Sequence, residues 1–376
     1  MIQTIGVIGG GQLGRMFTLD AKRMGYYVVA LDPQPHSPCG QVADEQIIAQ
    51  YHDLEAIERL GKQTDIVTYE FENIAIESVQ YLERNGFRVT PSSSVLSVTQ
   101  DRLREKTFVR ECGIPVANFA RVTNEADAAL AAAEVGFPAV LKTVRGGYDG
   151  KGQWRLGSQA DVAPALAQAN GAELIWEQFI PFEREVSVVC TRSASGECVT
   201  YPVAENEHDA GILFMSIVPA RVDAAVAAQA QAHATAIANA FEIVGTFCVE
   251  FFVTSGGTVL VNEIAPRPHN SGHYSMDATQ CSQYEQHVRA ICGLPLAQPE
   301  LLRNAVMVNI LGAGTGDHLL GTESLLSDPS IVLHMYGKRH AVARRKMGHF
   351  TMLVDGEAGE KAIERARNAH ALLHWG

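Results

Sequence analysis

Residues 1–31 carry the pattern that most constrains the fold: a strand, a glycine-rich turn, a helix and a second strand. The stretch 4-TIGVIG-9 is apolar, 10-GGQLGRMFTLDAKRMG-25 has helical spacing, and 26-YYVVALD-32 is apolar again. A second α/β unit follows in residues 53–90. Alternating α and β elements of this length predict a parallel sheet that is covered by helices on both faces.

Length and charge limit the classes of function. The 376 residues suggest two or three domains. The 42 acidic residues outnumber the 30 basic ones, and the net charge of −12 argues against nucleic acid or an anionic membrane as a partner. No window reaches the ~18 apolar residues of a membrane span, and the N-terminus shows no secretory signal, so we expect a cytoplasmic protein.

The seven cysteines are scattered and form no CxxC pair. This usage predicts reduced structural thiols, and neither a disulfide framework nor a zinc site. They are Cys39, Cys112, Cys190, Cys198, Cys248, Cys281 and Cys292.

The stretch 246–265 has the pattern of a β-hairpin that carries two glutamates. Two apolar, β-branched runs flank 255-SGGT-258, and Gly-Gly is typical of a two-residue type I′ loop. Such a loop pairs Glu250 with Glu263 on one face, with Cβ atoms about 4.5–5.5 Å apart. A divalent cation such as Mg²⁺, shared with substrate phosphates, would offset their repulsion.

A solvated outer face would instead make this pairing accidental, although the strongly apolar strands argue against that alternative. Simple alternation places Asn262 on the opposite face unless a bulge intervenes. The following segment, 266-PRPHNSGH-273, spaces His269 and His273 like a helical zinc pair, but its prolines and glycine disfavour a helix. We expect a loop that offers donors to an anionic substrate; a structural turn is the alternative.

Two glycine-rich stretches are candidates for phosphate binding. Gly9-x-Gly11-x-x-Gly14, with Asp32 ending the next strand, matches the dinucleotide fingerprint, yet a helix N-terminus suits a monophosphate ester equally well. The second stretch, 145-RGGYDGKGQW-154, is not a Walker A loop but follows a strand that carries Lys142. Its glycines allow close backbone approach to phosphate and suit a lid, although a plain hairpin turn also explains them.

Taken together, these motifs resemble those of the ATP-grasp superfamily and, within it, the family of 5-(carboxyamino)imidazole ribonucleotide synthases of purine biosynthesis. The resemblance extends from residue 9 to residue 349. The segments that carry it are GGGQLGRM at 9–16, ALDP at 30–33, TYEFENI at 68–74, LKTVRGGYDGKGQ at 141–153, EQFIPFEREVSV at 177–188, PVAENEH at 202–208, NEIAPRPHNSGH at 262–273, YGK at 336–338 and RKMGH at 345–349.

The resemblance implies an α/β protein with an N-terminal Rossmann-like (pre-ATP-grasp) domain at 1–98, an ATP-grasp domain at 99–294 and a small C-terminal domain at 295–376. It implies a Mg²⁺-dependent carbon–nitrogen ligase that uses ATP and bicarbonate to carboxylate 5-aminoimidazole ribonucleotide. ADP and phosphate are the other products. The implied partners are small molecules, and the implied assembly is a homodimer.

Carried over position by position, the resemblance implies an ATP site and a metal site. The ATP phosphates would contact Arg102, Lys142, Gly147, Tyr148, Asp149, Gly150, Lys151, Gly152 and Gln153. The adenine hinge would be Glu177, Gln178, Phe179 and Ile180, the ribose ligand Glu185, and the remaining nucleotide ligands His208, Asn262 and Glu263. The metal ligands would be Glu250 and Glu263, as the hairpin pattern independently indicates.

The resemblance places the ribonucleotide at the domain junction, with its phosphate against the first glycine loop. The implied substrate ligands are Gly11, Gln12, Leu13, Glu70, Arg267, Asn270, Ser271, Lys338 and Arg345. The implied catalytic residues are Tyr148, Asp149, Arg267 and Lys338. Tyr148 and Asp149 would close over carboxyphosphate, which forms when bicarbonate attacks the γ-phosphate and which must be kept from water.

Three departures from the family pattern stand out. The family motif R-P-G-R-K is replaced by 342-VARRK-346, which puts contacts from the first arginine in doubt. Phe214 and Met215 stand where polar side chains are expected, so nucleotide access there is in question. Ala265 replaces an asparagine ligand of many ATP-grasp proteins, as in the purine branch generally.

Two rival functions remain at this point. Another ATP-grasp ligase, such as a formate-dependent glycinamide ribonucleotide transformylase, would share most of these motifs. A nicotinamide-dependent oxidoreductase would use the first glycine loop, but it leaves the carboxylate hairpin without a purpose.

Overall fold

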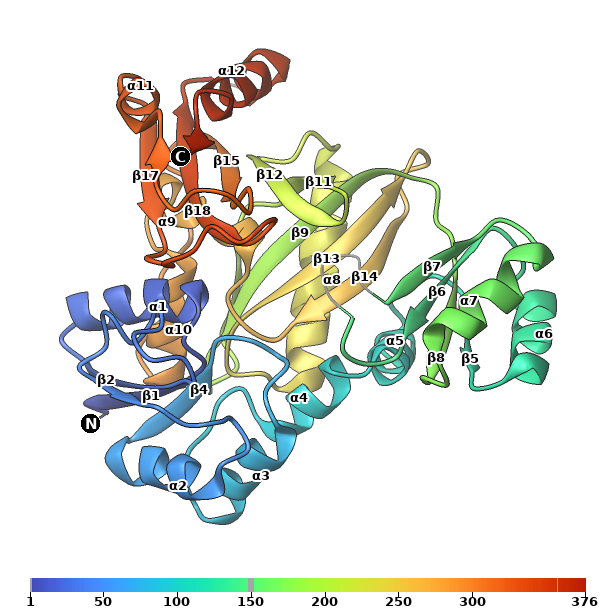
Figure 1. The fold of residues 1–376 in the computed structure, drawn as a ribbon, viewed down its shortest axis with the longest axis horizontal. Coiled ribbons are helices and arrows are strands. Elements are labelled where there is room, and N and C mark those ends of the chain that lie inside the picture. Colours follow the sequence, from blue (N-terminus) through green and yellow to red (C-terminus); the bar gives the residue numbers. More distant parts are fainter. Residues whose placement is uncertain (1, 148–151, 357) are drawn as a thin grey trace.

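The structure, a computed structural model, describes residues 2–147, 152–356 and 358–376. Figure 1 shows the N-terminal part (blue) and the C-terminal part (red) on one side of a central sheet, with a smaller lobe (green) on the other side. Among the described residues, no helix is long and apolar enough to cross a membrane.

The N-terminal part is a parallel sheet with the strand order β3-β2-β1-β4. Side chains on one face of β1, including Ile5 and Val7, pack against α1 and the distant α10, whereas Ile8 on the other face packs with α2 and α3. The predicted parallel sheet with helices on both faces is therefore confirmed. The elements are β1 (Thr4–Ile8), α1 (Gln12–Arg23), β2 (Tyr27–Leu31), β3 (Glu45–Ile47), α2 (Leu54–Gln63), β4 (Ile66–Tyr69), α3 (Ile76–Arg84) and α4 (Ser93–Thr99).

The small lobe holds an antiparallel sheet with the strand order β5-β8-β6-β7. One face of this sheet packs on α6 and α7 around the buried Trp176. α5 (Arg102–Glu111) precedes this lobe in the chain and packs on the core of the central sheet. The elements of the lobe are β5 (Phe119–Val122), α6 (Glu125–Glu134), β6 (Ala139–Thr143), β7 (Gln153–Leu156), η1 (Gln159–Asp161), α7 (Val162–Ala169) and β8 (Leu174–Gln178).

The central sheet is antiparallel and is covered on one face by α8, whose apolar stripe packs on β9, β13 and β14. The elements are β9 (Phe182–Arg192), β10 (Cys198–Thr200), β11 (Ala204–Asp209), β12 (Ile212–Val218), α8 (Ala224–Phe241), β13 (Gly245–Thr254), β14 (Val259–Ala265), η2 (Asn270–Gly272), α9 (Ser275–Ala278) and α10 (Gln283–Ile291).

The C-terminal strands extend the same sheet. β12 pairs with β15, and the described order is β14-β13-β9-β11-β12-β15-β18-β17, with β10 attached to β9. The elements are β15 (Asn304–Leu311), β16 (Leu319–Leu320), α11 (Thr322–Leu326), β17 (Ile331–Met335), β18 (Lys346–Val354), α12 (Glu360–His370) and β19 (His374–Trp375).

The sheet explains one departure of the sequence. Met215 is fully buried in the C-terminal core, and the Phe214 ring meets the His370 ring edge-on at 5.1 Å between centroids. Both side chains therefore serve the packing of β12 on α12, and neither lines the nucleotide cleft described below.

Candidate active site

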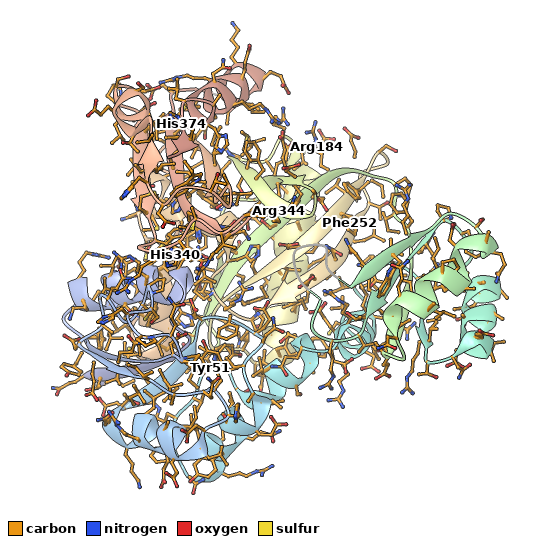
Figure 2. All side chains as sticks on the ribbon, in the orientation of Figure 1. Tyr51, Arg184, Phe252, His340, Arg344 and His374 are labelled. Atoms are coloured by element: carbon orange, nitrogen blue, oxygen red, sulfur yellow. The ribbon has the colours of Figure 1, made fainter. Side chains whose placement is uncertain are left out.

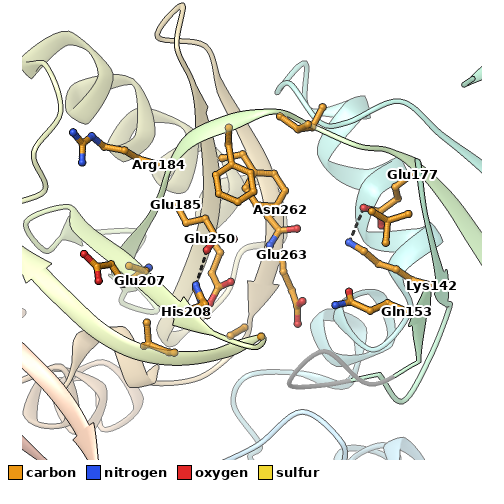
Figure 3. Close-up of a pocket in the computed structure, with 18 of the residues that line it drawn as sticks. Lys142, Gln153, Glu177, Arg184, Glu185, Glu207, His208, Glu250, Asn262 and Glu263 are labelled. Atoms are coloured by element: carbon orange, nitrogen blue, oxygen red, sulfur yellow. Dashed lines mark hydrogen bonds and ion pairs between the residues drawn. The ribbon is translucent and has the colours of Figure 1, made fainter. Parts of the chain in front are cut away.

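A cleft of ≈ 1110 Å³ lies between the small lobe and the central sheet (Figure 3). It is lined by side chains from β6, β8, β9, β11, β13 and β14, which are far apart in the sequence. Fifteen of the predicted site residues line it: Arg102, Lys142, Gly147, Gln153, Glu177, Gln178, Phe179, Ile180, Glu185, His208, Glu250, Asn262, Glu263, Arg267 and Asn270. Residues 148–151, which include Tyr148, Asp149, Gly150 and Lys151, lie outside the described residues, and Gly152 pairs with Thr143 beside the cleft.

Glu250 and Glu263 face each other across the hairpin, as predicted, but for a different reason. The loop has three residues, 255–257, because Val253 pairs with Val259. The expected two-residue loop is therefore wrong. With a three-residue loop and regular pairing, Glu250 would lie opposite Asn262 and not opposite Glu263, unless a compensating irregularity shifts the register. A bulge at Asn262 supplies it, since Phe251 pairs with Val261 while Glu250 pairs with Glu263.

The same bulge brings Asn262 to the cleft. Strict alternation would turn its side chain to the opposite face, yet Asn262 and Glu263 both line the cavity with Glu250. The doubt about Asn262 is thus resolved in favour of a position in the site. Three oxygen-bearing side chains converge there from two strands.

The carboxylates of Glu250 and Glu263 repel each other. Burial, together with the nearby charge of Glu263, raises the pKa of Glu250 to about 7. Arg102 Nη1 donates to Glu263 Oε2 at 3.0 Å, and His269 Nε2 lies 3.2 Å from Glu250 Oε1. Burial lowers the pKa of His269 well below its usual value, so that ring is neutral and leaves Glu250 without a full countercharge.

These residues fit a divalent cation. Opposed carboxylate oxygens and an amide oxygen are the hard ligands that Mg²⁺ prefers, and each Mg²⁺ site of this kind also recruits substrate phosphates. A cation between Glu250 and Glu263 would restore the ionised state that their mutual proximity disfavours.

The opposite wall of the cleft is cationic. Lys142 Nζ donates to Glu177 Oε2 at 2.8 Å, and the buried Lys106 lies 3.6 Å from the same oxygen. Although burial alone would raise it, the charges of Lys106 and Lys142 hold the pKa of Glu177 at about 2. One carboxylate thus contacts two ammonium groups, of which that of Lys142 lies in the cleft with Glu250, Asn262 and Glu263 (Figure 3).

Lys106 was missed by the sequence analysis, although it lies one helical turn after Arg102 on α5 and therefore faces the same side. Its Nζ also donates to the carbonyl of Asn262 at 2.9 Å, which connects α5 to the bulge in β14. The i, i+4 spacing was a usable signal.

At the ribose end, His208 Nδ1 and Glu185 Oε2 are 2.6 Å apart, on neighbouring strands β11 and β9. Burial lowers the pKa of His208, but the hydrogen bond and charge of Glu185 outweigh it and the net pKa is raised. The pair therefore presents a carboxylate that is already oriented for hydroxyl donors.

A second set of missed residues borders this end. Glu205 accepts from Arg184 Nη1 at 2.7 Å and from Arg221 Nη2 at 2.6 Å, and Figure 2 shows Arg184 at the cleft edge beside Phe252. Glu207 also pairs with Arg367, which links the cleft to α12. The partners of these ion pairs are distant in sequence, so no local sequence pattern predicts them.

The predicted ribonucleotide ligands gather beside this cleft. Lys338 Nζ donates to Gln12 Oε1 at 2.7 Å, which joins the C-terminal part to the first turn of α1. Burial and the nearby Arg345 lower the pKa of Lys338 to about 7. Leu13 and Glu70 line a small adjoining pocket.

The first glycine loop is already engaged by a carboxylate. The backbone amides of Gly11 and Gly14 both donate to Glu70, the latter at 2.8 Å to Oε2. Gly9 has φ +109°, and a Cβ there would collide with the Glu70 side chain, so glycine is required. The predicted phosphate contact with this loop stays a prediction, and it needs Glu70 to give way.

Three more predicted substrate residues are held by protein groups. Arg267 forms a buried ion pair with Glu72, and Asn270 Nδ2 donates to Asn309 Oδ1 at 3.0 Å. Ser271 is fully buried, with its hydroxyl 2.7 Å from that of Ser187. This buried position indicates that Ser271 stabilises the conformation of the loop more directly than it contacts a substrate.

The departure at 342-VARRK-346 has a structural outcome. Arg344 has a positive φ of 64°, and its Nη2 donates to the carbonyls of Asp209 and Ala210 at 3.3 and 2.8 Å. Figure 2 shows Arg344 where the C-terminal part meets the β11–β12 turn. The arginine therefore connects the Lys338 region to the strand that carries His208.

Comparisons with known protein families agree with this organisation. Residues 2–100 match the ribonucleotide synthetase preATP-grasp domain, residues 107–284 the ATP-grasp domain, and residues 305–364 the phosphoribosylaminoimidazole carboxylase C-terminal domain.

Individual relatives match over nearly the whole chain. The N5-carboxyaminoimidazole ribonucleotide synthase of Bacillus subtilis is 45% identical over 357 residues, which cover 94% of this chain and 92% of the relative. The structure of the Thermotoga maritima synthetase superposes with a TM-score of 0.89 at 43% identity and covers 99% of this chain and 98% of that one. The Aspergillus clavatus enzyme, solved with ADP and 5-aminoimidazole ribonucleotide, gives a TM-score of 0.91 at 31% identity, with 98% of each chain covered. This chain therefore belongs to the N5-carboxyaminoimidazole ribonucleotide synthase family of ATP-grasp ligases.

Proposed function

We propose that this chain uses Mg²⁺-ATP and bicarbonate to carboxylate the exocyclic amine of 5-aminoimidazole ribonucleotide in purine biosynthesis. The observation that carries the proposal is the facing of Glu250, Asn262 and Glu263 against Lys142 and Arg102 in one cleft. Oxygen ligands for a metal on one side of the cleft and cationic side chains on the other suit a nucleoside triphosphate whose γ-phosphate is transferred.

The first chemical step is the attack of a bicarbonate oxygen on the γ-phosphorus of ATP. The new P–O bond forms as the bond to the β-phosphate oxygen breaks, which gives carboxyphosphate and ADP. Arg102 and Lys142 offset the charge that develops on the phosphoryl oxygens. When bound, Mg²⁺ would add Lewis-acid stabilisation at those oxygens, held by Glu250 and Glu263.

In the second step the amine nitrogen forms a bond to the carboxyl carbon and phosphate leaves. The amine loses one proton as the carbamate forms, either by direct attack on carboxyphosphate or on carbon dioxide released beside it. We assign orientation of the ribonucleotide to Lys338, Gln12 and Arg267, which lie where the N-terminal, central and C-terminal parts meet. Tyr148 and Asp149 remain proposed as the residues that shield the intermediate from water.

The oxidoreductase alternative loses support at Asp32, beside the first glycine loop. Asp32, which a dinucleotide ribose would require, accepts from the Gly10 amide at 2.7 Å and from the Tyr51 hydroxyl at 2.5 Å. This carboxylate is therefore already engaged by this chain's own donors.

The test is ADP release from ATP and Mg²⁺ with bicarbonate and 5-aminoimidazole ribonucleotide, added singly and together. We expect rapid ADP release only with the full set, and carboxylated product in equal amount. Replacement of bicarbonate by formate, with glycinamide ribonucleotide as acceptor, distinguishes the related transformylase activity. Turnover with that pair, or none with the first, would overturn the proposal.

We also propose three further properties. Domain limits at residues 98 and 294 and a homodimer in solution rest on the family resemblance, and a cytoplasmic location is the expectation from the sequence. Light scattering coupled to size exclusion tests the dimer, since a mass near twice the 40.7 kDa of one chain is expected. A mass near one chain would contradict it.

A further inference from the structure

Two thiols lie side by side at one end of the central sheet. Cys190 on β9 pairs with Thr200, and Cys198 on β10 pairs with Arg192, so the two cysteines are diagonal neighbours on the same face. Their Sγ atoms are 3.2 Å apart. A disulfide bond is about 2.05 Å long, so closing it requires the sulfurs to approach by roughly 1 Å and, because diagonal neighbours usually lie about 7–8 Å apart, the backbones of β9 and β10 to move together.

The surroundings of Cys198 favour its thiolate. A hydrogen bond from Cys190 is the largest cause, and a hydrogen bond from Thr235 and the charge of Arg192 act in the same direction, so the pKa of Cys198 is lowered although burial opposes it. The described chain includes all seven cysteines, and burial raises the pKa of each of the other six. Cys198 is also only half-buried, whereas Cys190 is fully buried.

A low-pKa, accessible thiolate beside a second thiol is the arrangement of a reactive cysteine with its resolving partner. We propose that Cys198 and Cys190 form an oxidisable dithiol that reacts with hydroperoxides. This inference does not depend on the proposed function, because it concerns the protein's own thiols at a separate place.

The chemistry balances in two steps. The Cys198 thiolate attacks one peroxide oxygen and the O–O bond breaks, which leaves a sulfenic acid and, after proton uptake, an alcohol or water. The Cys190 sulfur then attacks the Cys198 sulfur, the S–O bond breaks, and water leaves with the Cys190 proton. The hydroperoxide is reduced by two electrons, and the two thiols are oxidised to one disulfide.

The pair is remote from the nucleotide site. Glu185 lies five residues away along β9, which corresponds to roughly 17 Å in a strand. The disulfide would join the two sides of the short turn that follows β9 and leave the cleft residues in place. We therefore expect turnover of the oxidised protein to stay within about twofold of the reduced protein.

The chain offers a direct readout, because Arg192 separates the two cysteines. We would treat the reduced full-length protein with hydrogen peroxide, block free thiols, and digest with trypsin without reductant. The expected product links peptide 185–192 to peptide 193–221, with a loss of about 2 Da relative to the two thiol peptides. Reductant should reverse it.

Variants assign the two roles. Cys198→Ser should abolish both the cross-link and any sulfenic adduct at this site, whereas Cys190→Ala should leave a Cys198 sulfenic acid that dimedone traps. Cys112→Ser is the matched control, since Cys112 is also half-buried but has a raised pKa, and it should cross-link like the parent protein. Thermal unfolding and basal turnover verify that each variant folds. If Cys190→Ala does not fold, Cys198→Ser alone tests the proposal.

Two results would overturn the inference. One is oxidation of Cys112 or a methionine at peroxide concentrations that leave peptides 185–192 and 193–221 unlinked. The other is a cross-link from either thiol to the peptide that carries Cys248.

Discussion

Glu70 places its carboxylate over the N-terminus of α1, where the Gly14 amide donates to Oε2 at 2.8 Å. The Gly11 amide donates to the other oxygen, so a protein carboxylate occupies the anion site that the glycine pattern predicted for a phosphate. Burial raises the pKa of Glu70, although both amide hydrogen bonds oppose this shift.

Glu70→Gln should weaken this arrangement without removing the side chain. An amide offers one acceptor oxygen, so one of the two glycine amides would face an N–H₂ group, at a cost of about 1–3 kcal/mol in unfolding free energy. We expect a lower melting temperature and a lower kcat/KM for the ribonucleotide, with KM for ATP unchanged. Glu45→Gln, which affects only surface contacts with Arg59 and Gln63, is the control. Unchanged ribonucleotide kinetics would contradict a role for Glu70 at that site.

Glu263→Gln should abolish turnover while the fold persists. Its side chain is 42% exposed, so the neutral amide fits without strain, but the opposed charge that would hold Mg²⁺ is lost. We expect ADP release to fall by about 10²- to 10³-fold, as when a charge-stabilising group is removed. Glu183→Gln, an exposed carboxylate on the cleft rim, should retain activity. Near-normal turnover of Glu263→Gln would refute the metal site.

Lys338 should make ribonucleotide use sensitive to pH near neutrality. Its folded pKa of about 7 lies below the ordinary 10.5, so the ammonium that attracts a phosphate is lost as pH rises through 7. We expect kcat/KM for the ribonucleotide to fall over that range, and Lys338→Arg to remove the fall because guanidinium stays charged. Between pH 7 and 10.5 the unfolded chain binds the extra proton, so this residue's contribution to stability rises with pH.

Lys338→Met should impair binding of the ribonucleotide and leave binding of ATP unchanged. Loss of a hydrogen-bonded charge is worth about 1.5–3 kcal/mol, so KM for the ribonucleotide should rise roughly 10- to 100-fold while KM for ATP stays constant. Steady-state kinetics with each substrate varied in turn measures both. A change confined to ATP would assign Lys338 to the nucleotide instead.

Arg344 allows a test of backbone strain against side-chain contact. At φ +64° a glycine avoids a penalty of roughly 1–2 kcal/mol, whereas alanine keeps the strain and loses the bonds to Asp209 and Ala210. Arg344→Gly should therefore be more stable than Arg344→Ala in chemical denaturation. At Arg339, an exposed neighbour without positive φ, the order should be reversed because glycine gains more entropy on unfolding. If the glycine and alanine variants have the same order of stability at both positions, backbone strain at Arg344 is not the cause of the difference.

Local periodicity predicted the N-terminal sheet well, because Ile5, Val7 and Ile8 alternate between two helix-covered faces. It was less reliable at the end of the α/β unit expected over residues 53–90, where the last segment contributes only a single bridge through Val89. Short segments carry too few apolar positions to decide between these states, and tertiary packing decides them.

The site shows the same division. Glu250 and Glu263 were paired correctly only because two one-residue errors cancel, a longer loop and the bulge at Asn262. Neither error is visible in side-chain alternation. Glu205 was missed because Arg184 and Arg221 become its partners only after β9, β11 and the segment after β12 assemble.

The pairing of β12 with β15 has a mechanical consequence. Backbone hydrogen bonds connect the strands from the hairpin that carries Glu250 and Glu263 to β18, whereas the strands of the small lobe belong to a separate sheet. The molecule thus consists of a stiff frame that holds Glu250, Glu263 and Lys338, and a lobe that carries Lys142 and Glu177. Loading of the nucleotide should be coupled to the angle of that lobe, while the frame keeps the ribonucleotide and metal ends in constant alignment.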